Sequence, residues 1–234
     1  MSPAVVVVGG GAIGLASAWR LAEAGCTVTV CDPEPARHAT HASAGMLAPV
    51  TEVHYGEDRL LGLNLAGNDR WPSFAAELEA AAGTPVGYRP CGSLLVALDA
   101  DDAAALADLG VYLTGLGLEA EALNGAGCRA LEPALAPGVR GGLRVRGDHQ
   151  ADNRQLAGAL LAALERAGVT LVTRRVARID VDDTTVRGVT LDDGTSLQSD
   201  HVVLAAGCWS GQDLGLPAEA VPPVRPVKGQ ILRI

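Results

Sequence analysis

A glycine-rich run near the start of the chain has the residue types and spacing to bind a phosphate group. Gly9, Gly11 and Gly14 fit the pattern G-x-G-x-x-G between a strand-like run and a helix-favouring run. Gly9 permits a tight turn, Gly11 lets the backbone approach a pyrophosphate without a Cβ atom in the way, and Gly14 lets the helix pack closely on the strand. The helix N-terminus adds N–H donors and the positive end of its dipole. The run therefore predicts a dinucleotide site.

An acidic residue follows at the spacing that such a site needs. Asp32 stands at the end of the next β-rich run, roughly 20 residues after the glycines. A carboxylate there accepts hydrogen bonds from the adenosine ribose hydroxyls and disfavours a 2′-phosphate. The glycines and the acid alone do not separate NAD from FAD.

The elements that must position these residues form a predicted βαβ unit. Ala4–Val8 and Thr27–Cys31 are β-rich, whereas Ala12–Ala24 carries good helix formers. Gly25 stands where a helix C-cap is expected. The glycine turn is thus predicted between the first strand and the helix.

Further elements are predicted in the second half of the chain. Asn153–Ala167 has the pattern of an amphipathic helix, and Val169–Thr173 that of a strand. Residues 175–197 indicate short strands, with Asp193-Gly194 as the hairpin signal. We expect a small antiparallel meander there.

The last part of the chain has mixed signals. His201–Ala206 is typical of a buried strand, and a helix is expected to begin at Trp209 or Ser210. Ala218–Pro226 contains three prolines and predicts an extended connection. The alternating residues 230–234 favour a strand with no turn after it, so we expect the sequence to end within a domain.

The stretch from about Pro85 to Gly147 lacks a phosphate-loop glycine pattern. Ser93–Leu98 predicts a strand, and Asp101–Leu116 predicts a helix rich in Ala and Leu. We interpret this stretch as part of an inserted second domain.

The composition excludes several classes of protein. The chain has 234 residues, of which 48% are hydrophobic and 19% charged, an ordinary balance for a globular fold. The net charge is −9 and the 18 Lys and Arg residues are scattered, so we expect no nucleic-acid partner. The N-terminus lacks a basic region followed by a cleavage site, and glycines interrupt its apolar run. We therefore expect a cytoplasmic protein with no membrane partner.

Cysteine and histidine spacing argues against a metal site. The cysteines form no CxxC pair, the histidines are dispersed, and we expect no metal. Free cysteine usually packs as a small hydrophobe, so we expect buried or semi-buried thiols at Cys26, Cys31, Cys91, Cys128 and Cys208.

A segment of small residues separates the cofactor alternatives. Thr40–Pro49 would let the backbone approach a flat ring system, although an ordinary Ala/Gly loop is the competing interpretation. The run Ala44–Pro49, followed by His54–Glu57, resembles the glycine oxidases of thiamine biosynthesis, within the D-amino-acid oxidase family of flavoproteins.

The resemblance runs along the whole chain. Individually weak landmarks occur in the order of that family: Cys91–Ala97, Leu131–Pro133, Asp148–Gln150, Val203–Gly207 with Trp209-Ser210, and Arg225–Gln230. The fold implied is α/β, α+β overall, with a Rossmann-like FAD-binding domain and an inserted, partly missing antiparallel-sheet substrate domain. We expect residues 1–86 and 147–216 to form the FAD-binding domain, and residues 87–146 and 217–234 to belong to the substrate domain.

The resemblance also implies a set of cofactor contacts. Met46 matches a position that also lies near the substrate side of the flavin. Two features depart from the family pattern, because Asp32 replaces the more usual Glu and the run 33–35 differs from the usual loop. The expected FAD-binding residues, including the glycines, are Gly9, Gly11, Ala12, Ile13, Gly14, Asp32, Pro33, Thr40, Ala44, Gly45, Met46, Val176, Ala206 and Gly207.

The activity implied is oxidation of an amino acid. A hydride would pass from the substrate α-carbon to FAD, leaving an imino acid, and oxygen would then reoxidise the flavin with release of hydrogen peroxide. Glycine is the favoured substrate; the alternatives are a sarcosine or D-amino-acid oxidase, or an inactive FAD-binding fragment. The partners implied are a small amino acid, oxygen and further copies of the chain in a homo-oligomer.

No catalytic side chain is assigned from the sequence. In the family, the substrate-binding Arg and Tyr follow the point that corresponds to Ile234, so we expect them beyond this residue. For Arg89, Arg154 and Arg225 we expect surface or interdomain pairing. His54 and Tyr55 are candidates either for the active-site entrance or for a structural loop, and Trp71 and Trp209 are expected in the core.

Overall fold

A computed structural model describes residues 2–183 and 185–232, which divide into two compact units. Unit 1 contains the described residues up to Ala44, the segment Ala76–Val86 and the described residues from Asp152 onward. Unit 2 contains Gly45–Ala75 and Gly87–Ala151. These bounds differ from the expected domain limits at residues 45–75, 147–151 and 217–232. Short strands of the first two segments pair with each other in unit 2, and residues 217–232 belong to unit 1 and not to the substrate domain.

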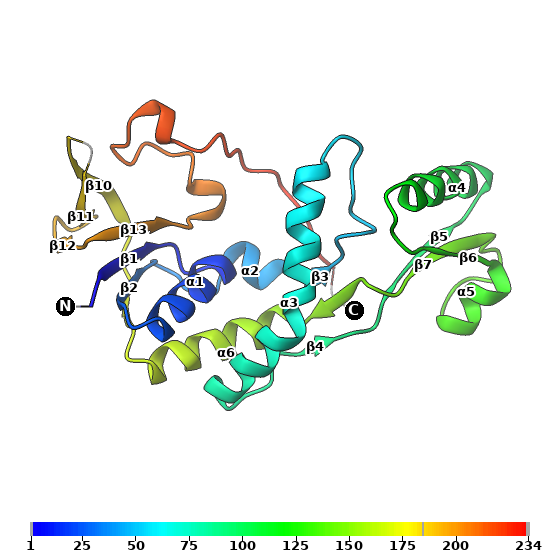
Figure 1. Cartoon of the computed structure of the whole chain (residues 1–234), viewed down its shortest axis with the longest axis horizontal. Helices are drawn as coiled ribbons and strands as arrows, with labels where there is room; N and C mark the ends of the chain where they lie inside the picture. Colours follow the sequence, from blue (N-terminus) through cyan, green and yellow to red (C-terminus); the bar gives the residue numbers. More distant parts are fainter. Residues whose placement is uncertain (1, 184, 233–234) are drawn as a thin grey trace. The chain divides into compact units, whose positions relative to one another are not determined.

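Unit 1 is built on a parallel sheet, with the strand order β13-β1-β2-β9 (Figure 1). Its strands are β1 (Ala4–Val8), β2 (Thr27–Cys31), β9 (Thr170–Val172) and β13 (His201–Leu204). Val5–Val8 are all buried, as expected for a central strand covered on both faces. The predicted βαβ unit is confirmed, and the sheet places the carboxyl ends of β1 and β13 side by side.

Two helices of unit 1 pack against each other, α1 (Ala12–Glu23) and α6 (Asn153–Arg166). α1 buries Leu15 and Trp19, and it ends before Gly25, whose φ of 88° requires the left-handed region. Asp152 caps the N-terminus of α6, because its carboxylate accepts hydrogen bonds from two N–H groups of the first turn.

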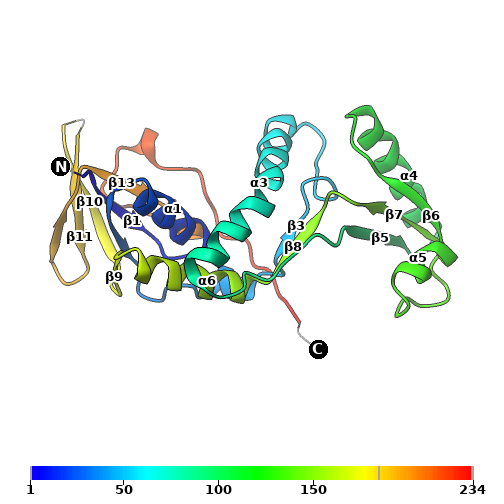
Figure 2. The same cartoon turned by 60° about the horizontal axis from the view of Figure 1, so that its bottom comes forward.

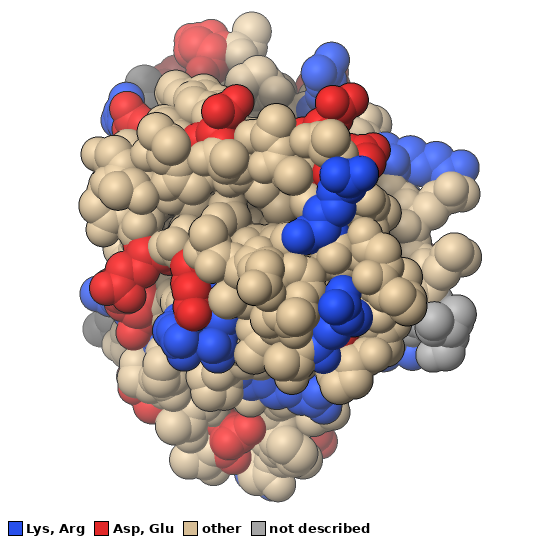
Figure 3. Space-filling model, turned by 90° about the vertical axis from the view of Figure 1, so that its right-hand side faces the viewer, with Lys and Arg blue, Asp and Glu red and all other residues tan. Residues whose placement is uncertain are grey.

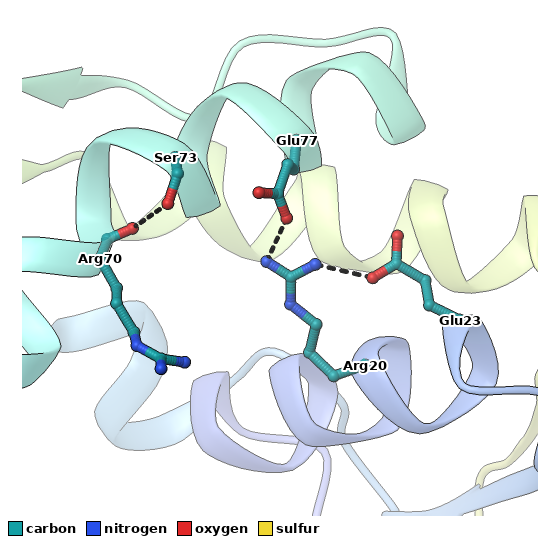
Figure 4. A network of polar contacts seen from close by, with 5 residues as sticks. All are labelled: Arg20, Glu23, Arg70, Ser73 and Glu77. Atoms are coloured by element: carbon teal, nitrogen blue, oxygen red, sulfur yellow. Dashed lines mark hydrogen bonds and ion pairs between the residues drawn. The ribbon is translucent and has the colours of Figure 1, made fainter.

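An ion-pair network joins α1 to the last turns of α3 (Asp58–Ala82), which belong to unit 1 (Figure 4). The Arg20 guanidinium contacts Glu23 at 2.7 Å and Glu77 at 2.6 Å. These side chains are about half exposed to solvent, so we assign the network a modest contribution to stability.

The predicted meander follows β9 in the chain. β10 (Val176–Asp182), β11 (Thr185–Leu191) and β12 (Ser196–Gln198) pair in antiparallel order, and Gly194 adopts φ 86° in the turn between the last two. Apolar side chains of the meander and of the parallel sheet share one core cluster, which contains Val6, Val8, Val176, Ile179, Val189, Leu191 and Leu214.

Unit 2 contains two small antiparallel sheets (Figure 2). One has the order β3-β8-β4 and the other β5-β7-β6, with α4 and α5 beside the second sheet. The elements are β3 (Met46–Leu47), β4 (Tyr88–Arg89), β5 (Ser93–Ala97), α4 (Ala100–Gly115), β6 (Glu121–Asn124), α5 (Gly125–Leu131), β7 (Gly141–Val145) and β8 (His149–Ala151).

Several elements differ from the sequence-based expectation. The 25-residue helix α3 was not predicted, since Pro72 and two glycines interrupt its pattern and its apolar residues are weakly segregated. The helix expected at Trp209 or Ser210 is a short 3-10 turn, η1 (Gly207–Trp209). Residues 230–232 form no strand, because no described strand pairs with them, and residues 233 and 234 lie outside the described part.

Exposure corrects the expectation for two cysteines. Cys31 and Cys128 are buried and Cys26 is half-buried, but Cys91 and Cys208 are exposed. Cys91 comes just after β4 (Tyr88–Arg89), and Cys208 lies within the short 3-10 turn η1 (Gly207–Trp209). Among the described residues, no group of His, Cys, Asp and Glu is arranged to hold a metal ion.

The surface carries mixed charges. On the face drawn in Figure 3, Lys and Arg side chains are interspersed with Asp and Glu. In the described part of the chain, no helix combines the length and the apolar character needed to cross a bilayer.

Candidate functional site

A pocket of about 440 Å³ opens in unit 1 beside the carboxyl ends of its parallel strands. This is the edge of an open parallel sheet at which ligands bind. Four chain segments form most of its wall: Val8–Ile13, Cys31–Glu34, Arg37–Thr40 and Ala205–Trp209. Arg175, Val176, Gln212, Leu214, Pro226 and Val227 complete it.

The glycine turn has the geometry that its sequence predicts. Gly9 has φ 109°, and a Cβ atom on it would overlap the Ala205 carbonyl oxygen. A Cβ atom on Gly14 would overlap the carbonyl oxygen of Gly9. One on Gly11 would meet only the Thr40 hydroxyl, at 3.2 Å. Gly9 and Gly14 therefore allow close backbone packing, and Gly11 avoids a tight contact with Thr40, which also lines the pocket.

The Asp32 carboxylate fixes the loop at the end of β2. Its Oδ2 atom accepts a hydrogen bond from the Gly10 N–H at 2.6 Å, and its Oδ1 atom accepts one from the Glu34 N–H at 2.7 Å. Each carboxylate oxygen has a further lone pair, so the group can still accept hydrogen bonds from ribose hydroxyls. Beside it, burial raises the pKa of the Cys31 thiol to about 11, which keeps that part of the wall neutral.

Thr40 links the glycine turn to α2 (His38–Ala42) and α6. Its hydroxyl oxygen accepts a hydrogen bond from the Ala12 N–H at 2.9 Å. Its carbonyl oxygen accepts a hydrogen bond from the Asn153 Nδ2 group, which also donates to the His41 carbonyl at 2.9 Å. Asn153 is 6% exposed, and no local sequence signal indicates this role because its partners lie more than 100 residues away.

Most of the residues expected to bind FAD lie on the wall of this pocket. They are Gly9, Gly11, Ala12, Ile13, Asp32, Pro33, Thr40, Val176, Ala206 and Gly207. Gly14 lies behind the wall, against Gly9. Ala44, Gly45 and Met46 do not line it.

Met46 lies instead on a separate pocket within unit 2. The Met46 side chain is 57% exposed, and the pocket has a volume of about 610 Å³. Leu47, Ala48, Pro49, Glu52, Leu63, Asn64, Gly67, Asn68 and Trp71 form the rest of its wall. The Asn68 Oδ1 atom is buried and accepts no hydrogen bond from the described residues.

Trp209 was expected in the core, and this prediction was wrong. Its side chain is 42% exposed and lines the dinucleotide pocket. The His38 ring meets it edge-on at 5.2 Å between centroids, while His38 Nε2 lies 3.1 Å from Glu34 Oε2. η1 follows β13 at the edge of the sheet. This position places Trp209 on the pocket wall and not in the core. Sequence reasoning missed Arg37, His38 and Arg175 on the same wall.

The other candidates are not among the residues that line this pocket. Arg89, Arg154 and Arg225 are exposed, and their guanidinium groups make no ion pair with the described residues. Tyr55 is 69% exposed and packs on Tyr112 with 4.1 Å between ring centroids. This contact gives Tyr55 a structural partner within unit 2.

The pocket fits the adenosine diphosphate portion of FAD. Gly9 to Ile13, at the N-terminus of α1, line the pocket, and the Asp32 carboxylate lies at the end of the neighbouring strand. Gly9 to Ile13 would hold the diphosphate, and Asp32 the ribose.

Comparisons with known proteins agree with this assignment. The bifunctional protein ThiO/ThiG of Trichormus variabilis is 35% identical, with 100% of this chain and 34% of the relative covered. The glycine oxidase of Pseudomonas putida is 33% identical, with 99% of this chain and 62% of the relative covered. The chain thus spans about a third of the bifunctional relative.

A solved structure has the same fold. The crystal structure of glycine oxidase from Geobacillus kaustophilus superimposes with a TM-score of 0.83 at 28% identity, over 92% of this chain and 58% of the other. The model of the family described as FAD dependent oxidoreductase (DAO) matches residues 4–234. The chain therefore belongs to the FAD dependent oxidoreductase family, whose cofactor is FAD.

Proposed function

We propose that this chain provides the FAD-binding part of a glycine oxidase that serves thiazole synthesis in thiamine biosynthesis. The observation that carries the proposal is the 35% identity to a ThiO/ThiG protein along the full length of this chain. The resemblance at Ala44–Pro49 and Arg225–Gln230 supports the same assignment. The enzyme would be an oxidoreductase acting on a CH–NH₂ group with oxygen as acceptor.

The proposed role of unit 1 is to bind and orient the cofactor. The glycine turn and the first turn of α1 would hold the diphosphate, and the Asp32 carboxylate would hold the ribose. When bound, FAD would supply the acceptor for the hydride of the substrate α-carbon, and oxygen would then take the two electrons together with two protons to form hydrogen peroxide. The protein has to hold that α-carbon in a near-attack geometry.

The proposed role of unit 2 is to contribute part of the substrate site. Met46, which matches a position near the substrate side of the flavin, lies on the pocket of about 610 Å³. A substrate carboxylate requires a bidentate Arg for fixed orientation. Among the described residues, no arginine lines this pocket.

Two measurements on the purified 234-residue chain test the proposal. A yellow flavin spectrum that survives gel filtration would support FAD binding, and peroxide release with glycine would report turnover. We expect the spectrum without peroxide, because this chain covers only 34% of the ThiO/ThiG relative and 62% of the glycine oxidase relative. A colourless chain that fails to take up added FAD would contradict the cofactor assignment.

The substrate needs a separate experiment. Peroxide release from the gene product extended past Ile234 should be compared for glycine, sarcosine and D-alanine. The highest kcat/KM with glycine supports the proposal, whereas a clear preference for sarcosine or D-alanine would make the alternative oxidases correct. The family resemblance also favours a cytoplasmic homo-oligomer, which light scattering and cell fractionation would test.

A further inference from the structure

The backbone amides of the glycine turn are partly engaged within the chain. The Gly9 N–H donates to the Cys31 carbonyl, the Gly10 N–H to Asp32 Oδ2 and the Ala12 N–H to Thr40 Oγ1. The end of a helix dipole amounts to only about half an elementary charge. A diphosphate bridge carries a negative charge on each phosphate, so the turn alone leaves much of that charge uncompensated.

Two arginines on the pocket wall are available to compensate it. Arg37 and Arg175 both line the pocket, and neither guanidinium makes an ion pair or hydrogen bond with the described residues. The neighbouring Arg174 differs, because it contacts Asp192 at 2.9 Å and Asp193 at 2.8 Å. His38, also on the wall, already contacts Glu34.

The turn that carries Arg37 is held in an unfavourable backbone conformation. Ala36 has φ 62° and His38 has φ 52°, so a residue in the left-handed region stands on each side of Arg37. Residues with a Cβ atom rarely adopt this region, and they keep it only where the surroundings fix them. Here the Ala36 N–H donates to the Gly10 carbonyl at 2.8 Å, and the His38 ring packs on Trp209.

These contacts distinguish Arg37 from Arg175. The hydrogen bond from Ala36 to Gly10 joins the Arg37 turn directly to the glycine turn. Arg175 instead precedes β10, and its carbonyl accepts a hydrogen bond from the Asp192 N–H in the meander. Of the two arginines, Arg37 is therefore the one whose turn is hydrogen-bonded directly to the glycine turn, the segment expected to approach the phosphates.

We propose that Arg37 is the side-chain cation that binds the diphosphate bridge of the cofactor, and that the strained turn 36–38 positions it. The guanidinium fork gives two parallel charge-assisted hydrogen bonds to phosphate oxygens, which a lysine cannot reproduce. The inference rests on FAD as the family cofactor, but not on glycine as the substrate.

Ligands with and without a diphosphate test the proposal. Binding of FAD, ADP and adenosine to the purified 234-residue chain and to Arg37→Gln should be measured by titration calorimetry. We expect Arg37→Gln to weaken FAD and ADP about tenfold or more, because a hydrogen bond to a charged group is lost. Adenosine, which has no phosphate, should bind both proteins within about twofold.

Matched variants separate this role from a general charge effect. Arg174→Gln removes an equal charge from the adjacent surface, and it should leave ADP affinity unchanged. Arg37→Lys keeps the charge without the fork, and its ADP affinity should lie between those of the wild-type chain and Arg37→Gln. Arg175→Gln should lower ADP affinity less than Arg37→Gln does.

Several outcomes would overturn the proposal. They are an unchanged ADP affinity in Arg37→Gln, an equal loss for adenosine and ADP, or an equal loss in Arg174→Gln. Failure of the wild-type chain to bind either FAD or ADP would also overturn it. Absence of peroxide with glycine would count against the proposed function only, because these titrations require no turnover.

Discussion

The Thr40 hydroxyl accepts a hydrogen bond at 2.9 Å from the amide of Ala12, in the first turn of α1. This bond fixes the entry to the helix against a segment 28 residues further along the chain. The amide is one of the N–H groups that a helix cannot satisfy internally. Thr40 thus caps α1 in place of the preceding residue, Gly11, which has no side chain to do so.

Thr40→Ala should weaken both the fold and the cofactor site. The Ala12 amide would lose its partner, so we expect a loss of about 1 to 2 kcal/mol in the free energy of unfolding, as for other lost helix caps. Urea unfolding measures this change, and calorimetry measures the parallel loss of FAD affinity. Thr40→Ser keeps the hydroxyl and should retain most of both. Equal behaviour of the two variants would contradict the capping role.

Gly14→Ala and Gly158→Ala should have opposite effects on stability. A Cβ atom at Gly14 would overlap the Gly9 carbonyl oxygen, so we expect destabilisation near the upper end of about 1–3 kcal/mol seen for overpacking. At Gly158, inside α6, nothing lies within 4 Å of the added atom. Alanine there should stabilise the chain by roughly 0.5–1 kcal/mol. Thermal unfolding of both variants tests whether close backbone packing is the reason for glycine at Gly14.

The Cys31 thiol should make stability depend on pH at alkaline values. Burial raises its pKa to about 11 from the ordinary 9.0, so the folded chain keeps a proton that the unfolded chain releases. Stability is therefore fully present below pH 9 and falls as the pH rises toward 11, by about 2 to 3 kcal/mol at most.

Other groups also titrate in this range, so the comparison must be between variants. Urea unfolding of the wild-type chain and Cys31→Ala at pH 8 and pH 10.5 isolates the thiol. The difference between the two proteins should shrink at the higher pH. A difference that does not change with pH would show that the thiol has no raised pKa.

Asp148 should be essential for the loop that leads from Met46 to Thr51. Its carboxylate is fully buried and accepts hydrogen bonds from the Val50 and Thr51 amides and from the Thr51 hydroxyl. Asp148→Ala leaves one buried and one part-buried amide without partners and should cost about 3 kcal/mol or more.

Thr51→Val is the matched control for this loop. It removes only the hydroxyl hydrogen bond, so its cost should be near 1 kcal/mol. Urea unfolding compares the two variants directly. A cost for Asp148→Ala no larger than that for Thr51→Val would contradict the role of the buried carboxylate.

Much of unit 1 could be predicted from the sequence because its signals are local. The glycine spacing, the β-branched runs and Gly25 lie within the first 31 residues, and each conformation depends on near neighbours. The hairpin at Asp193-Gly194 was predictable for the same reason. In contrast, α3 has Pro72 in its interior and a weak apolar stripe, so only packing against other elements makes it a helix.

The sequence by itself determined the dinucleotide turn, the acid at Asp32 and the family to which they belong. Only the tertiary structure decided that Trp209 and Arg37 line the pocket, and that Asn153 holds the Thr40 carbonyl. The physical reason is distance along the chain. Local conformation follows from the types and spacing of near neighbours, whereas the wall of a pocket is formed by segments far apart in sequence that the sheet brings together.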